Sequence, residues 1–278
     1  MASMRAIFIA GAFVVGIANL ASAADLLPPP PVPSPEAPIE TSGWYLRGDV
    51  GAGINMLSQQ DSTFAVSVPV GFANNGSGVG VQALVDVGAG YQFNNWFRFD
   101  VTGEYRTPAN YWGLESYTPA GLFPSLNCPA VCYDRYSANI SSAVFLANGY
   151  VDLGTWWGIT PFIGAGVGGT YNMFNNLADV GIETGGYGTA PNNGQFGLAW
   201  ALMTGVSYWL TPNLKLEFGY RYLDLGNVVS NPIACAGGCG GNGAESEKFH
   251  LASNDIRLGL RYVFAEVPPL APPLVTKY

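Results

Sequence analysis

Apolar and polar residues alternate one by one along eight segments of this chain. In the last segment Asp255, Arg257, Gly259 and Arg261 alternate with Ile256, Leu258, Leu260, Tyr262 and Phe264. A period of two places the two sets of side chains on opposite faces of an extended strand. We predict strands at residues 44–55, 81–93, 96–106, 136–153, 159–172, 195–210, 214–224 and 251–264.

The fourth predicted strand, 136–153, does not show which of its faces is outward. Two apolar sets compete for that face, namely Ile140, Val144 and Leu146 against Phe145, Ala147 and Val151. In the other strands the polar face carries much of the charge of the chain. A closed barrel in lipid turns its apolar face outward and its polar face into the lumen.

The connections between the predicted strands alternate in length. Long polar connections follow the first, third, fifth and seventh strands, and short turns such as 94–95 and 211–213 follow the others. An even number of strands with this alternation is typical of outer-membrane barrels. The sequence therefore predicts an all-β fold, an eight-stranded antiparallel transmembrane β-barrel with long extracellular loops and short periplasmic turns. A secreted all-β domain is the alternative.

Composition narrows the class of protein. Charged residues make up 11% of the 278 residues and hydrophobic residues 49%, whereas about 25% of residues in soluble domains are charged. Beyond the N-terminus no apolar run reaches the roughly 18 residues that a membrane helix needs. The net charge of −8 argues against nucleic acid as a partner, because nucleic acid is bound by clustered Lys and Arg.

The chain divides into four parts. Residues 1–23 read as a secretory signal peptide, with Arg5, an apolar run and an A-x-A site at its end. Residues 24–42 form a proline-rich leader, which we interpret as a periplasmic tether. The barrel is predicted at 43–264, and residues 265–278 are a second proline-rich tail.

The polar faces of the predicted strands suggest a charge network in the lumen. Its predicted members are Arg47, Asp49, Asp86, Arg98, Asp100, Glu104, Arg106, Lys215, Glu217, Arg221, Asp255, Arg257 and Arg261. Buried charges persist when they are paired, and eight strands leave an interior that side chains fill. We expect strand glycines such as Gly53 to make room for these side chains. Paired charges favour a plug that holds the barrel rigid, and a narrow ion path is the alternative.

Aromatic residues are predicted to mark the two membrane borders. We place Trp96, Trp156, Trp157, Trp209, Tyr262 and Phe264 at the periplasmic border, and Tyr105, Tyr136, Tyr171, Tyr220 and Tyr222 at the outer one.

Four cysteines lie in predicted loops as two local pairs, Cys128 with Cys132 and Cys235 with Cys239. An exported chain favours disulfides; cross-loop pairing and a zinc site are the alternatives. The single histidine, His250, and Ser253 face opposite sides of an extended strand, so they do not suggest a Ser–His pair. The sequence thus indicates neither an enzyme nor a cofactor.

Several motifs resemble a known family. The end of the signal peptide (ASA-AD), the proline-rich leader, GWYLRGDVGAG and the closing IRLGLRYVF resemble the small porin-like outer-membrane proteins and surface antigens of alphaproteobacteria, which are barrels of the OmpA/OmpX type. Within the closing segment, Arg257, Gly259, Tyr262 and Phe264 resemble the β-signal that the barrel-assembly machinery reads.

The resemblance implies a location in the bacterial outer membrane. It also implies contact with membrane lipid and lipopolysaccharide, and an unidentified host or surface ligand at the loops. The function that we expect is a structural and surface-interaction barrel that contributes to envelope integrity. A narrow porin for ions or small solutes is the alternative.

Overall fold

The computed structural model describes residues 42–64, 68–69, 71–118, 128, 130–236 and 245–264. The predicted signal peptide, all but the last residue of the leader, and the C-terminal tail lie outside the described residues. In the described part of the chain there is no helix with the length and apolar character that a helical membrane crossing requires.

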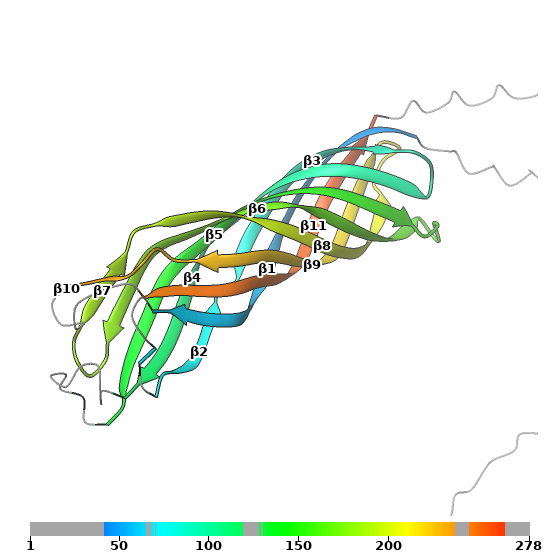
Figure 1. Ribbon diagram of the computed structural model, residues 1–278. Helices are drawn as coiled ribbons and strands as arrows, with labels where there is room; N and C mark the ends of the chain where they lie inside the picture. The colour runs from blue at the N-terminus through cyan, green and yellow to red at the C-terminus, as the bar shows by residue number, and fades with distance from the viewer. Residues whose placement is uncertain are drawn as a thin grey trace, which may run out of the picture. The chain divides into compact units, whose positions relative to one another are not determined.

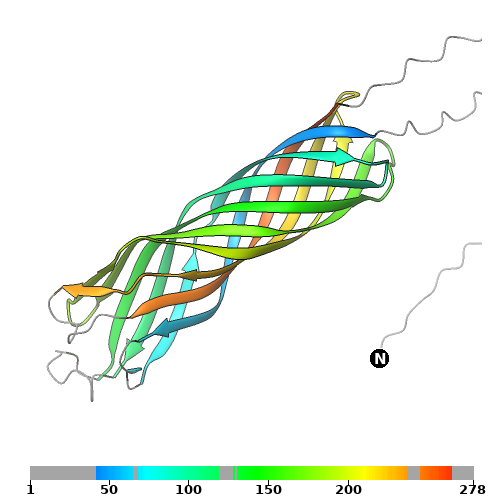
Figure 2. The ribbon, with the colours of Figure 1, turned by 45° about the horizontal axis from the view of Figure 1, so that its top comes forward.

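Eight antiparallel strands close into a barrel, as Figures 1 and 2 show, which confirms the predicted fold. Strand β1 pairs with β11, so the first and last strands close the ring, and β6 pairs with β8. The ring contains β1 (Gly43–Thr63), β3 (Gln82–Gln92), β4 (Phe97–Tyr117), β5 (Cys132–Asp152), β6 (Ile159–Gly181), β8 (Asn193–Trp209), β9 (Leu214–Val229) and β11 (Ser246–Val263).

The connections at the two ends of the barrel differ in length, as predicted. At one end short turns join β3 to β4, β5 to β6 and β8 to β9. In the first of these turns the side-chain oxygen of Asn94 accepts the backbone N–H groups of Trp96 and Phe97. Three short strands, β2 (Ala73–Val79), β7 (Tyr187–Ala190) and β10 (Ala234–Ala236), lie in the long connections at the other end.

The strands continue far beyond their predicted ends on the side of the long connections. Residues 107–117 and 173–181, predicted as loops, are strand in β4 and β6, and Tyr117 still pairs with Cys132. Outward positions there include polar residues such as Asn110 and Arg135, so the alternation that marks a lipid-facing strand fades. Backbone pairing nevertheless continues, and these strands form an extension of the barrel.

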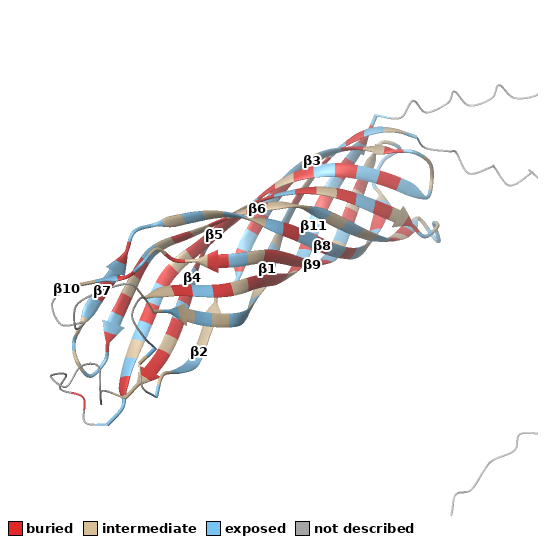
Figure 3. Ribbon diagram, viewed as in Figure 1, coloured by how far each residue is buried: buried red, intermediate tan, exposed pale blue. Residues whose placement is uncertain are grey.

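Burial alternates along the strands, as Figure 3 shows by its red and pale-blue bands. Most exposed large apolar side chains of the ring strands form a belt between the short-turn end and the extension. They fall within residues 44–56, 81–93, 97–105, 145–153, 159–167, 196–208, 218–220 and 256–264. Because such a belt matches the lipid-facing surface of a membrane barrel, we take these segments as membrane-spanning.

The structure settles the facing of β5. Ile140, Val144 and Leu146 are buried inside the barrel, and Phe145, 60% exposed, points outward. Tyr136 is buried as well, so its predicted place at the outer membrane border is wrong. Its inward position follows from the facing of β5, because residues an even number apart share one face of a strand.

Candidate functional site: the barrel lumen

All thirteen predicted lumen charges are buried inside the barrel. They come from five strands of the ring, β1, β3, β4, β9 and β11, and their partners are mostly residues distant in sequence.

 A sixth strand, β5, contributes Asp152, which pairs with Arg98. The structure therefore brings the predicted residues together inside the lumen, and each of them except Lys215 forms at least one ion pair among the described residues.

Two arginines and two carboxylates form the first part of this network. Arg221 lies 2.6 Å from an oxygen of Glu104 and 2.6 Å from an oxygen of Asp255. Arg106 contacts the same two carboxylates at 3.1 and 2.9 Å. A Cβ atom at Gly53 would collide with the guanidinium of Arg106 and with Asp255, so this glycine makes the room that was expected of it.

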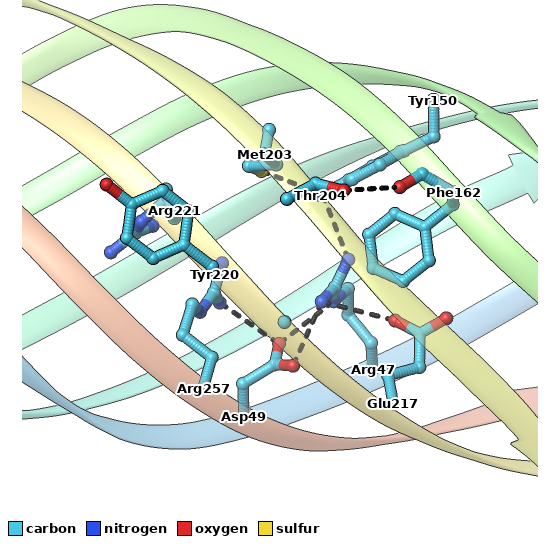
Figure 4. A pocket seen from close by; sticks show the side chains of 11 residues that line it. Arg47, Asp49, Tyr150, Phe162, Met203, Thr204, Glu217, Tyr220, Arg221 and Arg257 are labelled. Atoms are coloured by element: carbon cyan, nitrogen blue, oxygen red, sulfur yellow. Dashed lines mark hydrogen bonds and ion pairs between the residues drawn. The ribbon is translucent and has the colours of Figure 1, made fainter. Parts of the chain in front are cut away.

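Arg47 is the centre of the second part, shown in Figure 4. Its guanidinium lies 2.9 Å from Asp49, 3.1 Å from Asp100 and 3.4 Å from Glu217. Arg257 pairs with Asp49 and with Asp86. The cavity beside these side chains measures about 20 Å³, which is room for about one water molecule.

The third part lies toward the short-turn end. Arg98 pairs with Asp152 at 3.2 Å and Arg261 with Glu217 at 2.9 Å. The guanidinium of Arg98 also lies 4.0 Å from the ring centre of Tyr150. The ammonium of Lys215 lies 4.0 Å from the ring centre of Trp209, so this cation meets an aromatic face.

Asp152 is the charged member of the network that the sequence did not predict. It lies in β5, whose facing was ambiguous, and it shares the inward face with Ile140, Val144 and Leu146. With Asp152 the network contains seven cations and seven carboxylates. Pairing of this kind offsets the large cost of removing charges from water.

Aromatic side chains fill the lumen on the extension side of the charge network. The rings of Tyr111 and Phe249 stack with their centres 5.1 Å apart, and Phe174 lies 5.6 Å from Tyr111. All three side chains are buried. Sequence reasoning missed this stack because each of these residues falls in a segment that was predicted as a loop.

Cys128, Cys132, Cys235 and His250 lie at the end of the barrel that carries the extension. Cys128 and Cys132 form a disulfide. Cys235 is also disulfide-bonded, and Cys239 lies outside the described residues. His250 contacts Asp224 at 2.8 Å through Nε2, whereas Ser253 donates to Asp255 at 2.6 Å. His250 and Ser253 therefore contact different carboxylates.

The four residues that resemble an assembly signal divide between the two faces of β11. Arg257 pairs with Asp49, and a Cβ atom at Gly259 would collide with the Asp49 carboxylate. Tyr262 and Phe264 are exposed at the short-turn end, with ring centres 5.1 Å apart. Arg257 and Gly259 thus take part in packing inside the lumen, apart from any role in an assembly signal.

Comparisons with known proteins agree with this architecture. The family model described as Opacity family porin protein matches residues 89–241. An uncharacterised protein of Brucella suis biovar 1 (strain 1330) is 33% identical over 274 residues, which cover 88% of this chain and 93% of that protein. The outer membrane protein PagN of Salmonella typhimurium (strain LT2) is 30% identical over 126 residues, 45% of this chain and 51% of PagN. A putative adhesin of Rickettsia canadensis (strain McKiel) is 27% identical over 205 residues, 70% of this chain and 77% of the adhesin.

Proposed function

This chain belongs to the Opacity family of porin proteins, and we propose that it acts as a closed structural barrel whose extension meets the surroundings of the cell. The membership confirms the predicted resemblance and the location in the bacterial outer membrane. The short-turn end then faces the periplasm and the extension faces outward, as in other outer-membrane barrels.

The filled lumen is the observation that carries this proposal. Seven cations and seven carboxylates occupy it at membrane depth, and the stack of Tyr111, Phe174 and Phe249 lies beyond them. An ion that crossed the lumen would have to displace paired charges and then pass closely packed rings. Both obstacles favour a rigid plug over the alternative, a narrow porin.

Single-channel recording in planar lipid bilayers tests the closed lumen. We expect the purified, refolded full chain to give small conductance or none. A variant with Phe145→Ala is the matched control, because Phe145 faces outward and its loss leaves the lumen filled. Large, stable conductance steps from the unmodified chain would support the porin instead.

The outer surface of the extension supports a role in surface interaction. Trp112 is 54% exposed, and Tyr133, Ile182 and Tyr187 are exposed beside the long connections. Exposed aromatic residues are enriched where proteins bind partners, and one relative is named a putative adhesin. The proposed contacts are lipopolysaccharide, membrane lipid and a host or surface ligand.

Cell-binding assays test this surface role. Bacteria that display the unmodified chain are expected to bind host cells or matrix more strongly than bacteria that display Trp112→Ser with Tyr133→Ser. Equal surface amounts of the two chains must be shown first. Equal binding at equal amounts would contradict the assignment of this surface.

The ends of the chain suggest how the barrel reaches the membrane. We propose that residues 1–23 direct export, that 24–42 and 265–278 are periplasmic segments, and that Tyr262 and Phe264 present the β-signal to the barrel-assembly machinery. Both rings are exposed at the short-turn end, where a docking protein in the periplasm would meet them. A role in envelope integrity follows from the rigid barrel, and we propose no catalytic activity.

A further inference from the structure

A group of carboxylates lies inside the extension, away from the charge network. Glu115 of β4, Glu247 of β11 and Glu245 just before β11 each place a carboxylate oxygen within 4.8 Å of the others. Asp134 of β5 lies opposite Glu115 in the strand register, and Asp179 of β6 lies opposite Tyr136. Four strands of the ring therefore bring acidic residues to one end of the lumen.

Positive partners for this group are missing from the described part of the chain. None of the five carboxylates forms an ion pair there. The cations on the same stretches of strand, Arg135 and Lys248, are exposed on the opposite face. At membrane depth the same lumen matches every carboxylate with a cation, so the unmatched charge is confined to the extension.

Three buried carboxylate oxygen atoms of this group, one of them Oε1 of Glu245, have no hydrogen-bond partner among the described residues. Glu115 is 1% exposed, and its Oε2 atom lacks a partner among the described residues. Asp179 is 7% exposed, and its Oδ1 atom lacks a partner in the same part of the chain. A buried polar atom without a partner is costly and points to an ion or another group that satisfies it.

Neighbouring hydroxyl groups fix the orientation of the glutamates. Ser62 donates to Glu115 and, at 3.4 Å, to Glu247. Tyr111 donates to the other oxygen of Glu247 at 3.2 Å. These contacts connect the carboxylates to β1 and to the aromatic stack, so their positions are set by the barrel.

We propose that Glu115, Glu245 and Glu247 bind one divalent cation, Ca²⁺, inside the extracellular extension. Hard cations take oxygen ligands, and Ca²⁺ accepts them at about 2.3–2.6 Å in flexible geometry. Oxygen atoms that share one Ca²⁺ are at most about twice that distance apart, and the spacing of the three carboxylates fits this limit. The absence of Cys and His among the three disfavours zinc, which prefers sulfur and nitrogen ligands.

The ion would tie β4 to β11 where the barrel projects from the membrane. Asp134 and Asp179 would add negative potential without having to contact the ion. Protonation is the rival way to neutralise the group, since burial and then the charges of Asp134 and Glu115 raise the pKa of Asp179 to about 7. The two explanations differ in whether a metal ion binds at neutral pH.

Terbium luminescence tests the proposal, because Tb³⁺ replaces Ca²⁺ and is excited through nearby tyrosine. The probe is Tb³⁺ alone, added at neutral pH to the full chain refolded in detergent without lipopolysaccharide and cleared of metal by a chelator. We expect one saturable site, sensitised by Tyr111 and Tyr136, from which Ca²⁺ displaces Tb³⁺ with a Kd of about 10⁻⁴ to 10⁻³ M. Mg²⁺ is expected to compete more weakly.

Three variants locate the site. Glu115→Gln with Glu247→Gln should abolish the signal, and Glu245→Gln, at a half-buried position, should weaken Ca²⁺ binding at least about tenfold as one charged ligand is lost. Asp61→Asn is the matched control, because Asp61 is an exposed carboxylate in β1 directly before Ser62. This variant should bind Tb³⁺ and Ca²⁺ as the unmodified chain does. Heat-modifiable gel migration shows that each chain is folded.

Three results would overturn the proposal. They are the absence of saturable binding by the folded chain, unchanged binding in folded Glu245→Gln, and binding that appears only after lipopolysaccharide is added. The first would favour protonation, and the third would assign the ion to lipopolysaccharide. None of them depends on whether the lumen conducts, so the proposed function is tested separately.

Discussion

Replacing Arg221 with Met is the most direct test of the charge network. The guanidinium of Arg221 is buried and contacts Glu104 and Asp255, each at 2.6 Å. Met has a similar length but no charge. The replacement leaves Arg106 as the remaining cation of this part of the network, facing two carboxylates.

The expected loss of stability follows from that imbalance. Removing one partner of a buried ion pair costs about 3 to 5 kcal/mol, because it leaves a charge without compensation. Replacing both partners is often close to neutral. Arg221→Met combined with Glu104→Gln keeps one cation and one carboxylate, Arg106 and Asp255, which lie 2.9 Å apart. We therefore expect the double variant to be more stable than the single variant by about 2 kcal/mol or more.

Reversible urea unfolding in phospholipid vesicles, followed by tryptophan fluorescence, measures these differences. Glu104→Gln alone completes the double-mutant cycle and gives the coupling free energy between the two residues. A single Arg221→Met variant within about 1 kcal/mol of the unmodified chain would refute the reasoning, since it falls well below the cost of breaking a buried pair. Additive effects of the two changes would refute the pairing as well.

Four further predictions concern packing, pH and disulfides. Phe249→Ala removes a ring stacked on Tyr111 and should cost about 3 to 5 kcal/mol in the same unfolding assay, whereas outward-facing Phe145→Ala should cost less. Gly53→Ala should cost about 1 to 3 kcal/mol through overpacking against Arg106, and Gly149→Ala, where a Cβ atom meets open space, is its control. Because the folded-state pKa of Asp179 is raised to about 7, chiefly by burial and then by Asp134 and Glu115, its protonated form stabilises the fold at low pH. When a chelator removes divalent cations, that stabilisation should be lost as the pH rises from the ordinary pKa range of a carboxyl group through about 7. Stability measured by hydrogen exchange should depend less on pH in the Asp179→Asn variant than in the unmodified chain. Non-reducing peptide mapping should recover a Cys128–Cys132 link, and a Cys128–Cys235 link would contradict the local pairing.

The period-two pattern predicted the membrane part of the barrel well because the two faces of each strand there meet different environments. Lipid selects apolar residues such as Val85 and Phe99 on one face, and the lumen selects charged residues such as Asp86 and Arg98 on the other. Successive residues of such a strand therefore alternate between apolar and charged. This alternation is lost in β5, where apolar residues occupy both faces, with Ile140 inward and Phe145 outward. The outward face of β5 could not be identified without the partner strands.

The extension could not be predicted in the same way. Its outer face meets water, so polar residues such as Asn110 and Arg135 occupy positions that lipid-facing strands fill with apolar ones. Its inner face holds Tyr111 and Phe249, whose contact joins β4 to β11 across the lumen. A local pattern does not contain a contact between residues so distant in sequence, and the polar composition alone resembles that of a loop.

The barrel wall is surrounded by lipid at membrane depth and by water around the extension. This difference explains why the charges of the lumen are arranged differently at its two ends. At membrane depth the barrel wall is surrounded by lipid, so a carboxylate such as Glu217 must find its counter-charge within the chain, and Arg261 supplies it at 2.9 Å. In the extension the wall is surrounded by water that contains cations. Glu115 and Glu247 need no arginine if an ion from that water can enter and bind. A protein cation therefore compensates a carboxylate where the membrane excludes other ions, and the proposed Ca²⁺ takes over that role where it does not.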